Sequence, residues 1–212
     1  CAFTMPRSTL KKKAGRPADA DSAQTRRTIL RCARASFAEK GFDATTNKEI
    51  ANAAGVTPAA IYHYFPSKAD MFVGVCEEIA DTIVSSISDI ASRKGTLVEK
   101  IALLVDAATS LGASQTPAMT FVTGMRHEAI SHPEVREGIS RMQMSFRAAI
   151  TDIVRTADDE GGLLEGTTPE ALADFLGSVL SGFGRMNSYG QHERQVQAGQ
   201  TLMHLVRAAS HN

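Results

Sequence analysis

The 212-residue sequence has few cysteines, no net charge and no long apolar run. Its three cysteines include no Cys-x-x-Cys pair, which argues against a disulfide framework and against a cysteine-ligated zinc site. No uncharged apolar run reaches the roughly 18 residues that a membrane-spanning helix needs. No apolar stretch follows the basic N-terminus, which is unlike a secretory signal peptide. We therefore expect a cytoplasmic protein with no membrane partner.

Alternating β-branched runs, internal repeats and low-complexity segments are also absent. Hydrophobic residues make up 43% of the chain and charged residues 22%, which is typical of a folded protein with a sizeable core. A disordered chain would bury too little apolar surface to offset its conformational entropy. Because the apolar residues recur at helical spacing, we expect an all-α protein of about nine helices.

Charge is distributed unevenly along the chain. Residues 1–72 hold twelve Lys and Arg residues against six Asp and Glu residues, a net charge of +6, so the remainder carries −6. An excess of positive charge in residues 1–72 and of negative charge in the remainder favours a polyanionic partner for residues 1–72 alone. A solvated charged face would give the same count of charged residues. Residues 1–21, which include Lys11-Lys12-Lys13, are expected to form a flexible basic arm.

Residues 22–68 hold the signals of a helix-turn-helix. After a first helix, Thr46 and Glu49 have the spacing of a capping box, in which each side chain accepts a hydrogen bond from the other residue's amide. Gly55 permits the positive φ of a tight turn, and Thr57 then caps the next short helix. Two short helices joined by such a turn place a recognition helix in a DNA major groove.

The two faces of the third helix predict different roles. Apolar side chains are expected to form a core shared with the second helix: Ile50, Ala51, Ala54, Val56 and Ile61. The opposite face is small and polar at its edges, so its backbone can approach base edges: Thr57, Ala59, Ala60 and His63. Donors near the end of the helix are expected to bind phosphates: Tyr62, Tyr64 and Lys68. Each would equally serve as a core-closing or ordinary surface side chain.

Residues 69–212 are expected to form a larger helical domain. Prolines that follow Thr116, His132 and Thr168 are typical of the first residue of a capped helix. Glycines and these prolines predict helices over residues 68–93, 97–113, 169–187 and 191–209, with two more beginning at Pro117 and Pro133.

A set of short motifs lies within residues 24–72: Phe37-Ala38-Glu39-Lys40-Gly41-Phe42, Thr45-Thr46, Glu49-Ile50-Ala51, Ala54-Gly55-Val56-Thr57, Ile61-Tyr62-His63-Tyr64-Phe65, Ser67-Lys68 and Met71-Phe72. This set resembles the DNA-binding domain of TetR-type transcriptional regulators. The resemblance implies a homodimer that binds a palindromic operator, with the third helix of each subunit in a major groove. It also implies that an effector in the C-terminal domain changes the separation of the two DNA-binding domains. Carried onto this chain, it adds DNA contacts by Thr46, Asn47 and Lys48, although Asn47 replaces the small apolar residue or Thr that is common in the family.

Flexible and aromatic apolar residues between positions 117 and 147 favour a pocket for a small, largely apolar effector. The residues proposed for this pocket are Met119, Phe121, Met125, Arg126, Met142 and Phe146. The apolar members would equally form a plain core, and Arg126 would equally form a surface ion pair. His127, Glu128 and His132 do not share one helical face, so we expect no metal site there and no cofactor.

The last two predicted helices each carry an apolar stripe, which in the first of them alternates with small residues. Such stripes serve either as core or as interface, and the resemblance implies a dimer interface of two helices from each subunit. The residues expected in this interface are Phe175, Leu176, Val179, Phe183, Leu202 and Val206.

Together these patterns predict a ligand-responsive repressor without catalytic activity. No nucleophile–base pair has catalytic spacing, which argues against an all-helical enzyme. A constitutive DNA-binding regulator that binds no ligand is the main alternative, and operator position would decide between repression and activation. We expect residues 1–21 to contact the minor groove or the DNA backbone, residues 22–68 to form the DNA-binding domain, and residues 69–212 to bind ligand and dimerise.

Overall fold

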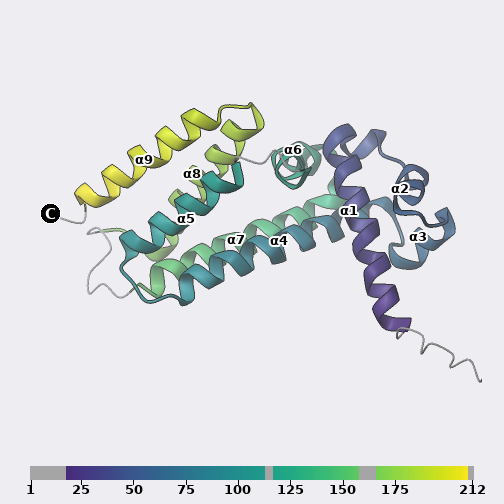
Figure 1. Cartoon of the computed structure of the whole chain (residues 1–212), viewed down its shortest axis with the longest axis horizontal. Helices are drawn as coiled ribbons and strands as arrows, with labels where there is room; N and C mark the ends of the chain where they lie inside the picture. Colours follow the sequence, from purple (N-terminus) through teal and green to yellow (C-terminus); the bar gives the residue numbers. More distant parts are fainter. Residues whose placement is uncertain (1–17, 113–116, 158–165, 210–212) are drawn as a thin grey trace, which may run out of the picture.

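The computed structural model describes residues 18–112, 117–157 and 166–209, and all regular structure within these ranges is helical (Figure 1). The helices are α1 (Ala18–Ala44), α2 (Asn47–Ala54), α3 (Pro58–Tyr64), α4 (Lys68–Ser92), α5 (Leu97–Gly112), α6 (Pro117–Ser131), α7 (Pro133–Arg155), α8 (Pro169–Ser188) and α9 (His192–Ala209). The predicted all-α class is confirmed. Within the described ranges, no helix combines the length and apolar character needed to cross a membrane.

Helix starts follow the capping signals of the sequence. Thr46, Thr57 and Thr168 each have extended backbone and accept a hydrogen bond from the amide three residues further on. His132 is the predicted N-cap residue of α7 and Pro133 follows at its first position, but the His132 side chain makes no capping hydrogen bond. Its ring instead faces acidic groups of neighbouring elements. Thr116 lies outside the described residues.

A kink at Gly41 interrupts α1 near its C-terminal end, where φ is +78° and ψ is 179°. Glycine adopts this positive φ at little steric cost, so the predicted helix stop at this residue is a sharp bend. Beyond the bend, the Phe42 ring packs against the rings of Phe37 and Phe72. The Thr45 hydroxyl donates to the Gly41 carbonyl at 2.7 Å, which holds the bend closed.

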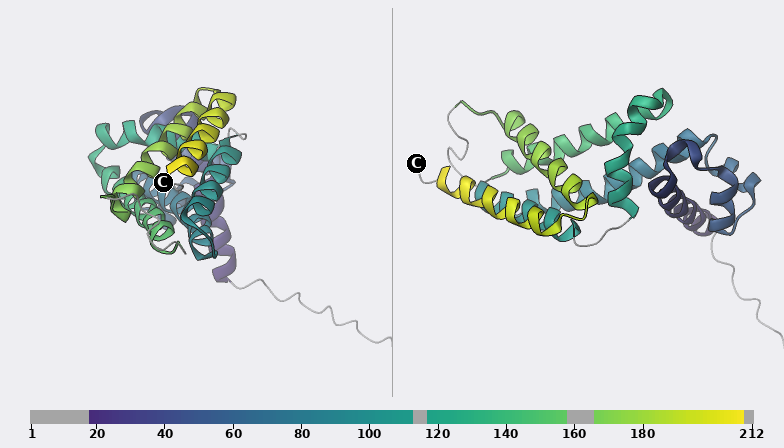
Figure 2. Two further views of the ribbon diagram at one scale, coloured as in Figure 1. Left: turned by 90° about the vertical axis from the view of Figure 1, so that its left-hand side faces the viewer. Right: turned by 90° about the horizontal axis from the view of Figure 1, so that it is seen from above.

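The molecule is elongated (Figures 1 and 2). Helices α1–α3 gather at one end and are called the N-terminal head below. Helices α4 and α7 lie side by side along the long axis, while α5, α8 and α9 lie toward the other end. Helix α6 packs against α1 and so connects the C-terminal part of the chain directly to the head.

Two hydrophobic cores hold these helices together. The first contains four phenylalanine rings whose neighbouring centroids are 4.7 to 6.4 Å apart: Phe37, Phe42, Phe72 and Phe121. Phe121 belongs to α6, and Ile139 and Met142 of α7 join the same core. The second core lies between α4, α5, α7, α8 and α9. The first core therefore crosses the expected domain boundary at residue 68.

Candidate nucleic-acid interface

The predicted capping box holds the start of α2. The Thr46 Oγ1 accepts from the Glu49 amide at 3.2 Å, and the Glu49 carboxylate accepts from the Thr46 amide at 3.3 Å. The Lys40 Nζ donates to the other Glu49 oxygen at 3.1 Å. The Lys40 hydrogen bond, and then the Thr46 amide, lower the pKa of Glu49. The stabilising effect of the ionised cap is therefore present at neutral pH and is lost as the pH falls through that lowered pKa.

A glycine turn brings α3 close to α2. Gly55 has φ +68°, and its amide donates to the Asn52 carbonyl at 3.2 Å. The Val56 amide donates to the Ala51 carbonyl at 3.0 Å, so the last carbonyls of α2 are satisfied within the turn. The predicted shared core is confirmed, because its members are buried or packed partly buried: Ile50, Ala51, Ala54, Val56 and Ile61.

The outer face of α3 is open to solvent. Its predicted base-facing and phosphate-facing side chains are exposed or partly exposed: Thr57, Ala59, Ala60, Tyr62, His63 and Tyr64. Tyr62 is 57% exposed, and the rings of His63 and Tyr64 meet edge-on at 5.3 Å. Because Ala59 and Ala60 carry only methyl groups, the backbone of α3 can come close to the edges of bases.

The contacts predicted at the start of α2 differ in accessibility. Thr46 and Lys48 are exposed. Asn47 is partly buried, and its Oδ1 is buried without a hydrogen-bond partner among the described residues. Thr46 and Lys48 are therefore accessible to a DNA backbone, and Asn47 only in part.

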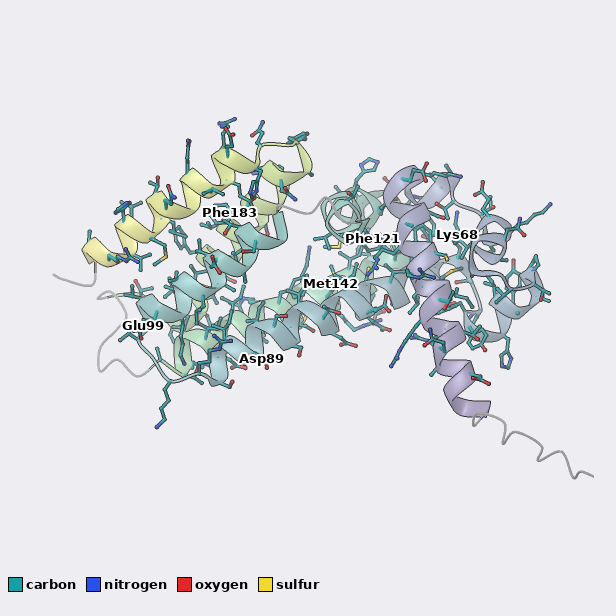
Figure 3. All side chains as sticks on the ribbon, viewed as in Figure 1. Lys68, Asp89, Glu99, Phe121, Met142 and Phe183 are labelled. Carbon is teal, nitrogen blue, oxygen red and sulfur yellow. The ribbon has the colours of Figure 1, made fainter. Side chains whose placement is uncertain are left out.

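Lys68 is engaged within the protein. Its Nζ donates to the carbonyl oxygens of Phe42, Thr45 and Asp43 at 2.7, 3.1 and 3.3 Å, beside the head (Figure 3). It also lies 4.4 Å from the centroid of the Phe42 ring. An ammonium group has three N–H donors, and these three bonds use all of them. The side chain therefore ties the turn at residues 42–45, beyond the kink at Gly41, to the start of α4, and a phosphate contact by Lys68 stays a prediction.

Three arginines of α1 add exposed positive charge to the head beyond the predicted contacts. Arg26, Arg27 and Arg31 are exposed, and the Arg26 guanidinium lies 5.2 Å from the centroid of the Phe65 ring. They contribute to the +6 charge of residues 1–72. The charge count of the sequence includes these arginines, but it does not show which side of α1 faces solvent, because that depends on how α1 packs against other helices. The basic segment 1–17 lies outside the described residues.

The residues predicted to bind an effector are mostly packed together. Phe121, Met125 and Met142 are at most 7% exposed in the first core, and Phe146 packs at its edge (Figure 3). The side chains of Met119 and Arg126 lie outside the described part of the chain. An open groove of about 430 Å³ lies between α5 and α9, and its lining residues come from those two helices.

The residues predicted for the dimer interface are divided between the core and the surface. Three are at most 8% exposed in the second core: Leu176, Phe183 and Leu202. Two more pack at its edge: Val179 and Val206. Phe175 is 53% exposed on α8, and Leu205, which was not in the predicted set, is 65% exposed on α9. Burial in the chain's own core leaves the first three unavailable to a partner subunit.

Comparison with protein families identifies the head. The model described as "Bacterial regulatory proteins, tetR family" matches residues 29–75, from α1 into α4. Residues 29–75 therefore belong to the DNA-binding domains of the tetR family of bacterial regulatory proteins. This confirms the resemblance seen in the sequence and makes the head a helix-turn-helix, DNA-binding domain of a transcription regulator.

The similarity to known proteins extends beyond the head. The nucleoid occlusion factor SlmA of Marinomonas sp. is 27% identical over 152 residues, which cover 72% of this chain and 76% of that protein. The HTH-type transcriptional repressor Rv1474c of Mycobacterium tuberculosis is 25% identical over 176 residues, covering 83% and 89%.

Solved structures share the fold of nearly the whole chain. GusR of Salmonella enterica matches with a TM-score of 0.76 and 23% identity, covering 95% of this chain and 100% of that one. FadR of Bacillus subtilis, in complex with stearoyl-CoA, matches with a TM-score of 0.69 and 19% identity, covering 85% and 96%.

Proposed function

We propose that this TetR-family regulator is a dimeric repressor that binds a palindromic operator. The observation that carries the proposal is the open outer face of α3, where Ala59 and Ala60 leave room for base edges. Each subunit places α3 in one major groove, with the half-sites about 34–36 Å apart or a multiple of that distance. Repression follows where the occupied operator overlaps a promoter, and the similar protein of M. tuberculosis is named a repressor.

The proposed contacts divide into base and phosphate contacts. The base-facing residues are Thr57, Ala59, Ala60 and His63, and the methyl groups of the alanines suit thymine methyls. The phosphate-facing residues are Thr46, Asn47, Lys48, Tyr62 and Tyr64. The basic arm of residues 1–21 adds contacts in the minor groove or along the backbone. Residues 22–68 form the DNA-binding domain, and residues 69–212 bind the effector and dimerise.

The proposed effector is a small, largely apolar molecule that binds between α6 and α7. Phe121, Met125 and Met142 meet there, in the same core as Phe37 of the head. A ligand inserted among these side chains would separate α6 from α1 and displace the head. It shifts the equilibrium only by its difference in affinity for the two states. The similar FadR structure, which holds stearoyl-CoA, supports an acyl chain as the first ligand to test.

Ala59→Glu tests the proposed DNA-binding face. The new carboxylate would face phosphates and bases, so we expect affinity to fall about 100-fold or more through like-charge repulsion. Ala59 is exposed, so the stability of the fold should not change. Binding is measured by fluorescence anisotropy on a duplex that the wild-type protein enriches from a random-sequence library. Ala148→Glu adds the same charge to an exposed position of α7 and is the matched control. Equal affinity of the two variants would contradict the proposed face.

Constitutive DNA binding is the second candidate function. The tight packing of Phe121, Met125 and Met142 favours it. Titration of stearoyl-CoA and shorter acyl-CoAs into the protein–duplex complex separates the two candidates. Release of the duplex supports an effector, whereas no release and no shift in melting temperature supports constitutive binding.

A further inference from the structure

The end of α6 reaches across to the turn at residues 42–45, beyond the kink at Gly41 in α1. The Glu128 Oε1 of α6 accepts a hydrogen bond from the Phe42 amide at 3.1 Å, between residues 86 positions apart in the chain. The other oxygen of Glu128 lies 3.3 Å from the Nε2 of His132. The same Nε2 lies 3.5 Å from the Asp43 Oδ1, and the His132 and Phe42 rings lie 4.6 Å apart. The Glu128 carboxylate and the His132 imidazole therefore join the end of α6 to Phe42 and Asp43, the two residues after the kink at Gly41.

This junction is largely shielded from water. The side chains of Glu128 and His132 are each only 14% exposed. A largely buried hydrogen bond to an ionised group is directional and costly to break, because the remaining partner is left unsatisfied. The other charged groups nearby are Glu134, 3.7 Å from the His132 Nδ1, and Lys68, on the Phe42 ring.

The kink at Gly41 is shaped to receive Glu128. A Cβ at Gly41 would lie 3.2 Å from the Glu128 Oε1, so the glycine serves both the positive φ and the close approach of the carboxylate. Lys68 holds the same turn by binding the carbonyls of Phe42, Asp43 and Thr45. The turn is thus held on one side by α4, through Lys68, and on the other by α6, through Glu128.

We propose that Glu128 is a positioning residue that sets the orientation of the head relative to α6. This inference rests on the proposed function, because only a dimer that binds two half-sites needs its heads at a defined separation. Without the carboxylate, each head still presents α3 and binds DNA of any sequence through its cations. The two heads of a dimer no longer match one half-site spacing, so binding of the operator weakens selectively. His132 supports Glu128 and Asp43 from the start of α7.

The test compares Glu128→Ala and Glu128→Gln with the wild-type protein on two duplexes. One duplex is enriched by the wild-type protein from a random-sequence library, and the other is an unselected duplex of equal length. We expect Glu128→Ala to lose about tenfold in affinity for the selected duplex and less than about twofold for the unselected one. Glu128→Gln should lose about threefold on the selected duplex, because its amide oxygen can accept from the Phe42 amide without carrying charge toward His132.

A spectroscopic readout follows the hydrogen bond itself. The ¹H–¹⁵N resonance of the Phe42 amide should move in Glu128→Ala and return part of the way in Glu128→Gln. Glu170→Gln is the matched control, because it breaks an ion pair with Arg155 at the far end of α7 and should leave both duplex affinities unchanged. Circular dichroism shows whether each variant folds. If Glu128→Ala does not fold, the threefold loss of affinity for the selected duplex in Glu128→Gln tests the positioning role.

The remaining outcomes contradict either the positioning role of Glu128 or the proposed function. Wild-type affinity of the variants for the selected duplex overturns the positioning role of Glu128. An equal loss on both duplexes also overturns it, because a merely weakened fold would affect both alike. A wild-type protein that enriches no duplex contradicts the proposed function itself, and the inference falls with it.

Discussion

Lys48 and Lys68 carry the same charge in different surroundings. Lys48 is exposed on α2, whereas the ammonium group of Lys68 binds three carbonyl oxygens of the turn at residues 42–45. Loss of a donor leaves partly buried carbonyls unsatisfied, while loss of an exposed lysine mainly removes an attraction to phosphate. We therefore expect Lys48 to contribute to DNA binding and Lys68 to contribute to the stability of the head.

Substitution of each lysine by methionine separates these roles. Lys68→Met is expected to lower the free energy of unfolding by about 1–3 kcal/mol, measured by urea denaturation. Lys48→Met should change it by less than about 0.5 kcal/mol. It should also weaken DNA binding and reduce the salt dependence of the affinity by about one unit of slope. A Lys68→Met protein with wild-type stability and weaker DNA binding would support the predicted phosphate contact of Lys68 instead.

At the scale of elements, a single glycine lets α4 and α7 lie close together. A Cβ at Gly138 of α7 would lie 2.6 Å from the Cγ2 and 2.8 Å from the Cγ1 of Val73 on α4. Gly138 has no left-handed φ, so the constraint is space and not backbone conformation. Because α4 leaves the head directly after α3, this contact helps to place the long helix pair relative to the head.

Gly138→Ala should therefore destabilise the protein by about 1–3 kcal/mol through overpacking. Val73→Ala in the same chain should recover part of that loss, because it removes both methyl groups at the contact. Gly124→Ala is the control, since a Cβ there would meet no heavy atom within 4 Å among the described residues. Thermal unfolding of the two single variants and the double variant gives the coupling free energy between residues 73 and 138. Strictly additive losses would show that the two residues do not meet.

At the scale of the whole molecule, the two ends present different surfaces. The head lies at one end (Figure 1), where it exposes the small residues of α3 and the side chains of Arg26, Arg27 and Arg31. At the other end, α8 and α9 expose Phe175 and Leu205 to solvent. In a two-fold dimer the same patch meets its own copy, so exposed apolar residues on these helices suit a self-complementary interface. Phe183, which sequence reasoning placed in that interface, lies inside the chain's own second core.

The double variant Phe175→Asp/Leu205→Asp is expected to convert the dimer to a monomer without unfolding it, as measured by light scattering with size exclusion. Phe183→Asp should instead lower stability by several kcal/mol, because it buries a charge in the core. Met144→Asp is the control, since Met144 is 70% exposed on α7 and outside α8 and α9. A dimer that survives the double variant would place the interface on another face.

What the sequence determined by itself is local. The caps at Thr46 and Thr57 and the turn at Gly55 depend on hydrogen bonds between residues three to five positions apart, so spacing is enough to predict them. The open face of α3 also follows from helical periodicity, because burying Ile61 turns Ala59 outward. The helix-turn-helix could therefore be predicted from the sequence.

The features that local sequence patterns did not predict depend on contacts between distant segments of the chain. The hydrogen bond from the Phe42 amide to Glu128 joins residues 86 positions apart. The binding of Lys68 to the carbonyls of residues 42–45 depends on how the start of α4 packs against them. In the same way, Phe183 faces inward because α5 and α9 cover it. An apolar stripe shows that a helix has a buried side, but what buries it depends on the packing of helices far apart in the chain.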